Sequence, residues 1–485
     1  MVGNDRLFCR ASVARAVSRF VLVALVALPP PALAAAADSP PALAGASLPL
    51  LWALPFAGLL LSIALVPLVN ARLWHAHFGK IAAAWSAALI VPFALRFGSD
   101  LAIYHVVHAI VAEYVPFVVI LFALYTIAGG ICVRGSFVGT PVLNTGILAL
   151  GAAMASLMGT TGASMLLIRP LLTANEARSR KTHTVVFFIL LVGNVGGALS
   201  PLGDPPLFLG FLKGVDFLWP LQNLSAPTAL LGIALLAIYL ALDAWHYRED
   251  RLRLATAARR PRVAIEGTLN LLLIVAVIGA VLMSGLWHPG IEFDVLGTRV
   301  PLEKLLRDLA LAALALASLA LTPREIRAHN AFHWAPIVEV AKLFAGIFIT
   351  IVPVIAMLAA GRDGPLAAIV DLIVSPTGVP HDLATYWTTG ALSAFLDNAP
   401  TYLVFFNLAG GDATALMTTS DTTLKAISMA AVFFGALTYI GNAPNFMIKA
   451  VAEDRGITMP GFLAYVLQAG LVMLPLLAVI GALFL

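Results

Sequence analysis

Two aspartates stand in apolar stretches of the sequence, where a charged side chain is costly. Asp204 lies in GALSPLGDPPLF at 197–208, and Asp397 lies in SAFLDNAPT at 393–401. An ionisable residue at membrane depth is a candidate functional residue by default. A carboxylate there can bind Na⁺ when it is ionised and hold a proton when it is neutral, so the two cations can compete for one site. The alternative for Asp204 is a helix amino-cap that is satisfied by backbone amides.

The segment around Asp204 recurs later in the chain. GALTYIGNAPNF at 435–446 follows the same pattern at a shift of 238 residues (441 − 203), with Asn442 in place of Asp204. The same shift places MGTTGAS at 158–164 on LDNAPTY at 396–402. Gly, Pro and cap residues interrupt helices, and the backbone groups that a break frees within lipid must face protein, water or an ion.

These four segments, two interrupted helices and two hairpin turns, are the four breaks. We therefore expect them to converge and to form one or two small ion sites. Asn398 is expected to cap the helix after the second hairpin turn, and Thr160 or Thr161 the helix after the first. The Na⁺ ligands are expected among Asp204, Asp397, Asn398 and Asn442. The full set of expected ion- or substrate-binding residues is Thr160, Thr161, Asn194, Ser200, Gly203, Asp204, Asp397, Asn398, Thr438, Gly441 and Asn442.

Composition indicates which solvent surrounds the chain. Hydrophobic residues make up 61% of the 485 residues, charged residues only 11%, and the mean hydropathy is +0.96. Soluble domains carry about a quarter charged residues, so most side chains here must face lipid or each other. The net charge of +4 comes from basic residues in short loops without interleaved aromatic residues, which excludes nucleic acid as a partner.

The amino-terminal 1–34 segment has the pattern of a secretory signal peptide. Four arginines precede the short apolar run FVLVALVAL, and small residues follow, with cleavage expected near Ala34. The alternative is an uncleaved anchor, but the apolar run is short for a bilayer.

Ten later segments are apolar over a length that can span a bilayer core of roughly 30 Å. Two further regions, Val142–Leu172 and Leu383–Leu408, are apolar but interrupted, and each is expected to form a re-entrant hairpin. The ten expected spans are Leu50–Val69, Ile81–Phe97, Val115–Val133, Thr184–Phe211, Pro227–Leu242, Ala264–Leu286, Leu305–Leu321, Ala335–Ala360, Leu424–Val451 and Phe462–Leu485.

Loop charges agree with this topology only if both hairpins return to the side they started from. Arginine and lysine then collect in the loops expected to be cytoplasmic, as the positive-inside rule requires. Each half has three crossings, a hairpin and two crossings, so the second half is inverted relative to the first. We expect an all-α polytopic protein of a bacterial-type cytoplasmic (inner) membrane, with an inverted repeat at 48–245, a basic cytoplasmic linker at 246–263 and a second repeat at 264–485.

The four breaks also carry a resemblance to a known family. GTTGASMLLIRPLL, NVGGALSPLGDPP, SAFLDNAPT and GNAPN resemble motifs of the ion transporter superfamily. That superfamily includes bacterial D-type sodium/proton antiporters, arsenite carriers, citrate carriers and dicarboxylate/sodium symporters. The resemblance implies two hairpins and two unwound helices per protomer, a transport core docked on a scaffold, and often a homodimer.

The leading functional hypothesis is a Na⁺(Li⁺)/H⁺ antiporter that works by alternating access. Replacement of Asp397 by Asn is then expected to abolish cation-dependent proton movement. The alternative within the same fold is a Na⁺- or H⁺-coupled carrier of an anion such as citrate, a dicarboxylate or arsenite. Arg169 is expected either to pair with such an anion or to reach the cytoplasmic surface.

An intramembrane hydrolase is the alternative from another class. Pro201 breaks the Gly-x-Gly-Asp pattern of the aspartyl type, and Ser164 has no histidine in a later span to act as its base. We therefore expect no enzyme and no cofactor; the lipid bilayer, the transported solute, and Na⁺ and H⁺ are the expected partners.

Overall fold

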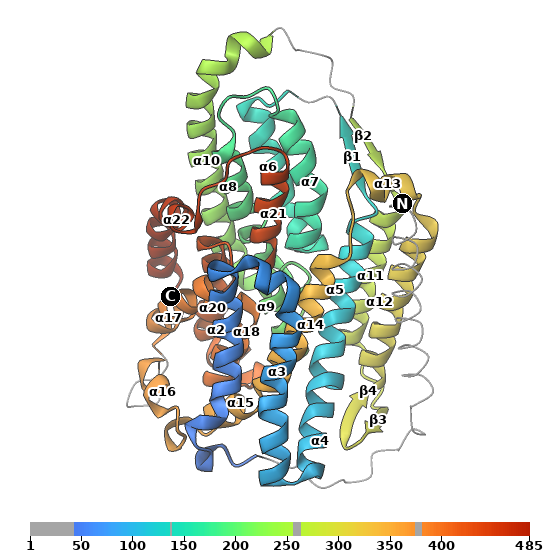
Figure 1. Cartoon of the computed structure of the whole chain (residues 1–485), viewed down its shortest axis with the longest axis vertical. Coiled ribbons are helices and arrows are strands. Elements are labelled where there is room, and N and C mark those ends of the chain that lie inside the picture. The colour runs from blue at the N-terminus through green and yellow to red at the C-terminus, as the bar shows by residue number, and fades with distance from the viewer. Residues whose placement is uncertain (1–42, 136–137, 256–262, 374–380) are drawn as a thin grey trace.

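A computed structural model describes residues 43–135, 138–255, 263–373 and 381–485. The expected signal peptide at 1–34 lies outside the described residues. Helices dominate the fold, and two short antiparallel strand pairs are the only sheets in the described part of the chain (Figure 1). The expectation of an all-α polytopic protein is confirmed.

The first half of the chain runs through fourteen elements before the linker. They are η1 (Gly45–Ser47), η2 (Leu50–Ala53), α2 (Leu54–Val69), α3 (Ala71–Phe97), α4 (Ser99–His108), the π-helix η3 (Ala109–Tyr114), α5 (Val115–Ala128), β1 (Cys132–Gly135), α6 (Pro141–Met158), α7 (Thr160–Ala174), α8 (Thr182–Leu191), η4 (Val195–Leu199), α9 (Pro205–Leu212) and α10 (Trp219–Ala255).

The second half follows the same plan. Its elements are β2 (Val263–Glu266), α11 (Leu269–Leu286), β3 (Glu292–Val295), β4 (Thr298–Pro301), α12 (Leu302–Leu321), α13 (Arg324–His329), α14 (Ala335–Thr350), α15 (Val352–Ala359), η5 (Gly361–Asp363), α16 (Ala367–Ile373), α17 (Asp382–Phe395), α18 (Asn398–Leu408), α19 (Ala413–Thr418), α20 (Asp421–Phe434), η6 (Gly435–Leu437), α21 (Ala443–Asp454) and α22 (Phe462–Phe484).

Within the described residues, eight helices are long and apolar enough to cross a membrane, or nine if the bent pair α14–α15 is one span. Two of the ten expected spans fall outside this set. The first, α12, carries charged residues in its first two turns, and the second is interrupted between α20 and α21. The set also includes α6, which is the first arm of a hairpin rather than a full crossing.

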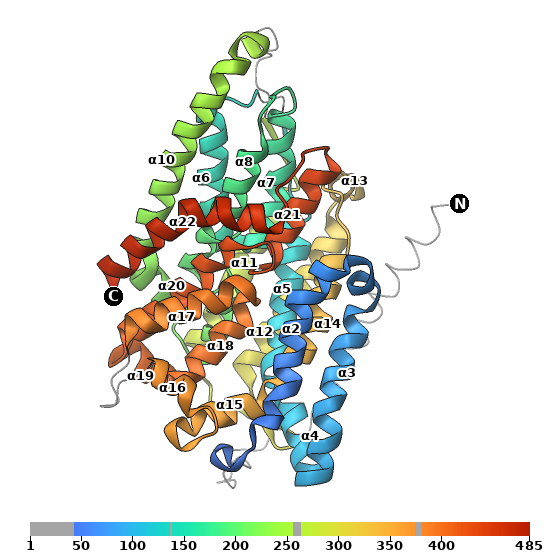
Figure 2. The same ribbon diagram turned by 60° about the vertical axis from the view of Figure 1, so that its left-hand side comes forward.

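Both hairpins form where the sequence predicts them. Helices α6 and α7 pack together across the single residue Gly159, and α17 packs on α18. In Figures 1 and 2 the first hairpin, α8 and α21 lie in the upper half, whereas the second hairpin and α20 lie in the lower half. The equivalent elements therefore point in opposite directions, as an inverted repeat requires.

The interrupted helices form the centre of the molecule. The span that contains α8 and η4 is 83% buried, whereas the other seven candidate spans are 17–39% buried. A helix that is apolar all round and buried on all sides belongs to a core, not to the lipid-facing surface. The breaks are thereby kept away from hydrocarbon.

Two strand pairs modify the expected boundaries. The helix expected to end at Val133 ends at Ala128, and Cys132–Gly135 pairs instead with Val263–Glu266, which brings the start of the second half beside α5. Helix α10 continues to Ala255, through the first part of the expected linker. The pair β3–β4 joins α11 to α12 at the opposite end of the molecule (Figure 1).

Candidate functional site: the crossing of the two broken helices

The two hairpin tips contact the two breaks through matching backbone bonds. The amide of Thr160 donates to the carbonyl of Gly203 over 2.9 Å, and the amide of Asn398 donates to the carbonyl of Gly441 over 3.2 Å. Both members of the second bond lie 238 residues after those of the first (398 − 160 and 441 − 203). The internal repeat that the sequence predicts therefore holds at the level of individual hydrogen bonds.

Side chains hold each break in the same way. Ser200 Oγ accepts from the Leu202 amide over 3.1 Å and donates to the Ser156 carbonyl. Its counterpart, Thr438 Oγ1, accepts from the Gly441 amide over 2.9 Å and donates to the Ala394 carbonyl over 2.5 Å. These two expected site residues fix the backbone of the breaks and do not contact either candidate carboxylate.

Glycine is needed where each break folds back on itself. A Cβ at Gly203 would stand 2.1 Å from the carbonyl oxygen of Gly197, and one at Gly441 would stand 2.7 Å from that of Gly435. No real Cβ approaches backbone so closely, so a larger residue would open the break. The role of both glycines is to allow this close approach.

The carboxylate of Asp204 lies at the crossing and is 1% exposed. Its Oδ1 accepts from Asn442 Nδ2 at 2.9 Å and from Thr160 Oγ1 at 3.1 Å, and its Oδ2 accepts from Asn398 Nδ2 at 2.6 Å. The donors come from both hairpin tips and from the opposite break. Both halves of the chain therefore enclose one carboxylate.

The residues at the amino-cap positions of the four helices at the crossing differ from the expectation. Asp204 and Asn442 occupy the amino-cap positions of α9 and α21, but neither side chain makes a capping bond. The cap of α18 is Asp397, whose Oδ1 accepts from the Ala399 amide at 3.1 Å, and not Asn398. The cap position of α7 is Gly159, not a threonine. Asn398 and Thr160 are the first helical residues, and their side chains turn to Asp204 instead.

A chain of carboxamides continues from Asp204 into the protein. Asn442 Nδ2 also lies 3.2 Å from Asn194 Oδ1 and 3.1 Å from the Gly193 carbonyl. Asn194 Nδ2 in turn donates to Asn445 Oδ1 over 2.8 Å. Asn445 is fully buried and was not predicted from the sequence, although it lies in the repeated GNAPN segment.

Asp397 lies near this cluster without bonding to Asp204. Asp204, Asp397, Asn442, Thr160 and Thr161 all line one cavity of about 460 Å³. Thr161 faces the cavity and has no contact with Asp204 among the hydrogen bonds of the described residues. The expected residues that line the cavity therefore divide into those that bond to Asp204, which are Thr160 and Asn442, and those that do not, which are Thr161 and Asp397.

One end of the cavity is lined by polar and charged residues. Arg169 lies nine residues after Thr160 on α7, about 13 Å at 1.5 Å per residue, and Asp454 ends α21. His75, His333 and Glu339 line the same cavity from α3, the segment before α14, and α14. All these positions belong to the end that the charge pattern predicts to be cytoplasmic.

Aromatic side chains line another part of the cavity. Phe208 of α9 and Phe344 of α14 line it, and buried Phe117 stacks on Phe344 with ring centroids 4.4 Å apart. Lys213, which follows α9, pairs with Glu113 at 2.6 Å. Asp204 and Asp397 therefore share one cavity with both the charged and the aromatic residues.

The polar groups around Asp204 are a hydroxyl and two carboxamides. Among the described residues no group of three or more His, Cys, Asp or Glu side chains lies close enough to hold a metal ion. The site instead offers carboxylate, carboxamide and carbonyl oxygens beside unwound helices, which are Na⁺ ligands in broken-helix transporters. Asn398 Oδ1 is buried and has no hydrogen-bond partner in the described part of the chain.

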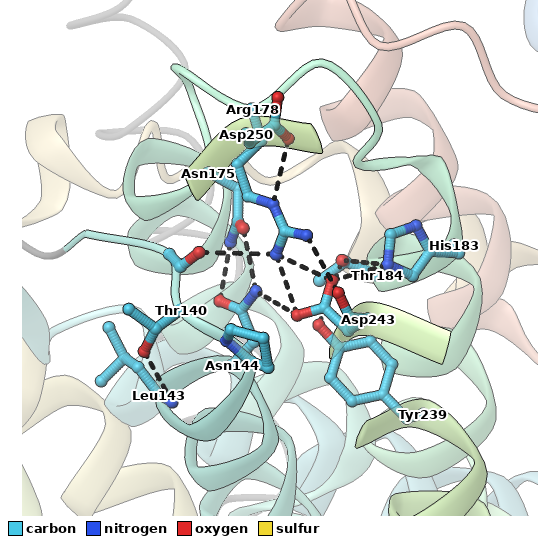
Figure 3. Close-up of polar contacts among 12 residues, drawn as sticks. Thr140, Leu143, Asn144, Asn175, Arg178, His183, Thr184, Tyr239, Asp243 and Asp250 are labelled. Atoms are coloured by element: carbon cyan, nitrogen blue, oxygen red, sulfur yellow. Dashed lines mark hydrogen bonds and ion pairs between the residues drawn. The ribbon is translucent and has the colours of Figure 1, made fainter. Parts of the chain in front are cut away.

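A second buried polar cluster lies at the base of the first hairpin (Figure 3). Arg178 and Asp243 form an ion pair at 2.7 Å, and both side chains are 0% exposed. Asp243 also lies 2.7 Å from His183 Nε2 and accepts from Asn144 Nδ2 over 3.2 Å. We call these residues, together with Asn175, the base cluster. Sequence reasoning missed the cluster, because its members come from α6, α8, α10 and the loop between α7 and α8.

Two interrupted helices that cross between two hairpins, with an enclosed carboxylate and a cavity beside it, have the plan of a secondary transporter. The sequence comparison agrees with that class. The chain belongs to a transporter family whose description reads "Putative citrate transport", and the family profile matches residues 45–485. A search of curated proteins finds no match to the chain.

Proposed function

We propose that the protein exchanges Na⁺ or Li⁺ for H⁺ at the crossing of its broken helices. The observation that carries the proposal is the Asp204 carboxylate, which receives hydrogen bonds from both hairpin tips and from the opposite break. A cation that binds there replaces a proton, and movement of the core relative to the scaffold then exposes the site on the other side.

The charge of the cavity supports a cationic substrate. Four carboxylates line it, from Asp204, Asp397, Glu339 and Asp454, against one guanidinium, from Arg169. A lining with an excess of acidic groups raises the local concentration of cations and repels anions.

Carriage of citrate is the second candidate, and it is favoured by the family description. A cavity of about 460 Å³ lies within the size range of small-molecule sites, roughly 300–1,000 Å³. Arg169 could pair with one carboxylate of citrate. The remaining carboxylates would face an acidic lining, so this function requires co-transported cations.

Proteoliposomes distinguish the two candidates. Purified protein is reconstituted with an internal pH dye, and Na⁺, Li⁺ or citrate is added outside with a pH gradient imposed. We expect Na⁺ and Li⁺ to drive proton movement and citrate alone to leave it unchanged.

D204N is the matched variant, since it keeps the size of the side chain and removes the charge. We expect exchange to fall to the level of protein-free liposomes. Asp454→Asn at the cavity end of α21 is the control and should retain most of the activity. Citrate-dependent flux without any Na⁺ response would assign the anion carrier instead.

A further inference from the structure

Asn445 is the far end of the carboxamide chain that starts at Asp204 and runs through Asn442 and Asn194. Its Nδ2 donates to two carbonyls of its own break, Gly435 at 2.8 Å and Thr438 at 2.9 Å. A flipped amide would set oxygen against both carbonyl oxygens. The orientation of this side chain is therefore determined, and its Oδ1 must face Asn194.

The next side chain is determined in turn. Asn194 Nδ2 donates to the Ile189 carbonyl and to Asn445 Oδ1, both over 2.8 Å. With its nitrogen on that side, Asn194 presents Oδ1 to Asn442 Nδ2. Together with the Gly193 carbonyl, which lies 3.1 Å from the same nitrogen, this acceptor makes Asn442 direct its amino group, and not its carbonyl oxygen, to Asp204.

We propose that Asn445 is a positioning residue for the cation site, because it fixes the direction of the relay Asn445–Asn194–Asn442 that delivers a hydrogen-bond donor to Asp204. The inference rests on the proposed function for its consequence in transport, but the geometry stands without it. All three asparagines are at most 1% exposed, so water does not substitute for a missing partner.

The repeat itself supplies the best substitutions. The position that matches Asn445 in the first half is Leu207 (445 − 238), and the position that matches Asn194 in the second half is Val432 (194 + 238). Both counterparts are buried apolar residues. N445L and N194V therefore introduce side chains that the same backbone already accommodates, and each removes one link of the relay.

Infrared difference spectra measure the relay directly. The carboxylate band of Asp204 is identified by its loss in D204N, and its position reports on the donors around it. We expect N445L and N194V to displace this band by the same amount, and the double variant to displace it no further, because residues of one network are not additive. N407L is the control, since Asn407 is an asparagine on α18 whose amide donates only to the Leu403 carbonyl among the described bonds.

Flux measurements on the same variants test the consequence for transport. We expect the KM for Na⁺ to rise about tenfold in N445L and N194V, which corresponds to the loss of one well-placed hydrogen bond, with the maximal rate retained. Should N445L not be recovered folded, N445S is measured in its place, with the same expectation.

The two measurements separate the two hypotheses. A displaced band with no Na⁺ response in wild-type protein would support the relay and reject the antiporter. Na⁺ exchange with an unmoved band in N445L would reject the relay and leave the antiporter. Additive displacements in the double variant would also overturn the relay, since they would indicate two independent structural contacts.

Discussion

The two hairpins have matching tips but different bases. At the tips, the Thr160 and Asn398 amides make equivalent bonds to the two breaks. At the bases, Asn144 and Asp382 occupy matching positions, since 382 − 144 is 238. Asn144 joins the buried base cluster around Asp243, whereas Asp382 accepts one bond from Thr423 Oγ1 over 2.5 Å.

This difference shows that the repeat preserves backbone geometry where the hairpin tips meet the breaks and not where the hairpins are anchored. The base of the first hairpin is tied to α10 by the Arg178–Asp243 ion pair, whose side chains are 0% exposed. Among the hydrogen bonds of the described residues, the base of the second is joined to α20 through the Thr423 hydroxyl. At the nearby start of α20, Lys425 forms a partly exposed pair with Asp421 and lowers the pKa of its carboxyl. The described polar contacts at the first base are thus more numerous and more deeply buried than those at the second.

The largest expected effect comes from the bases. D243N leaves the buried Arg178 with only the longer contact to Asp250, at 3.7 Å, as an ionic partner among the described residues, and removal of one member of a buried ion pair costs about 3–5 kcal/mol. D382N removes one hydrogen bond at the matching hairpin and should cost about 1 kcal/mol. Thermal unfolding of both variants in the same detergent, followed by tryptophan fluorescence, measures the difference.

Equal losses in the two variants would show that the base cluster does not anchor the first hairpin more strongly. Exchange by the D243N protein that remains folded should be close to that of the wild type, because Asp243 lies outside the cavity. A specific loss of exchange without a loss of stability would place Asp243 in the transport path instead.

The two breaks differ in chemistry although their backbones agree. The Asp204 carboxylate and the Asn442 amide are counterparts, and they lie 2.9 Å apart. Two carboxylates at that distance could not both be ionised. The first half therefore supplies this carboxylate, and the second half supplies two of its three side-chain donors.

An exchange of these two residues tests whether either half can carry the charge. In D204N/N442D the carboxylate moves to the second break, where it faces the Gly193 carbonyl and Asn194 Oδ1, two acceptors that now lack a donor. Each such loss costs about 1–3 kcal/mol, so we expect exchange at about 1–10% of the wild-type rate. Initial rates of Na⁺-driven proton movement in proteoliposomes give the value.

D204N alone is the reference for the double variant D204N/N442D, and the D204N protein should show no Na⁺-driven proton movement. Full recovery in D204N/N442D would mean that the surroundings of the two positions are interchangeable, against the asymmetry of the relay. No recovery above D204N would place the requirement for a carboxylate on the first break alone.

The sequence was sufficient to predict the parts that depend on local pattern. Gly203, Asp204 and their counterparts in GNAPN predicted the breaks, and loop charges predicted that both hairpins return. Neither the base cluster nor Asn445 could be found this way. Single asparagines or arginines at the ends of apolar runs are common, and only packing shows which of them meet.

Local pattern favoured Asp397 over Asp204 as the ion-binding carboxylate, because Asp204 could equally have been a simple helix cap. The structure gives the cap bond to Asp397 and three side-chain donors to Asp204. A capping role depends on rotamer and on neighbours distant in sequence, which spacing does not reveal.

The smallest expected effect follows from that reversal. Asp397 has Gly159 as its counterpart, so only the second tip carries an accessible carboxylate at the cavity. Asn is as good an amino-cap as Asp, so D397N should keep α18 and the fold. Loss of one lining charge weakens the attraction of cations, and we expect the KM for Na⁺ to rise about threefold to tenfold with the maximal rate unchanged.

The contrast between D397N and D204N decides which carboxylate exchanges the ion. Na⁺ concentration series in proteoliposomes should show an altered KM for D397N and no exchange for D204N. D454N controls for the general effect of removing a cavity charge, and it should change the KM less, because Asp454 lies at the far end of α21 from the crossing. The reverse outcome would be an inactive D397N protein and a working D204N protein. It would move the exchange site from the crossing to the second hairpin tip, because the cation would then bind at the Asp397 carboxylate where it lines the cavity.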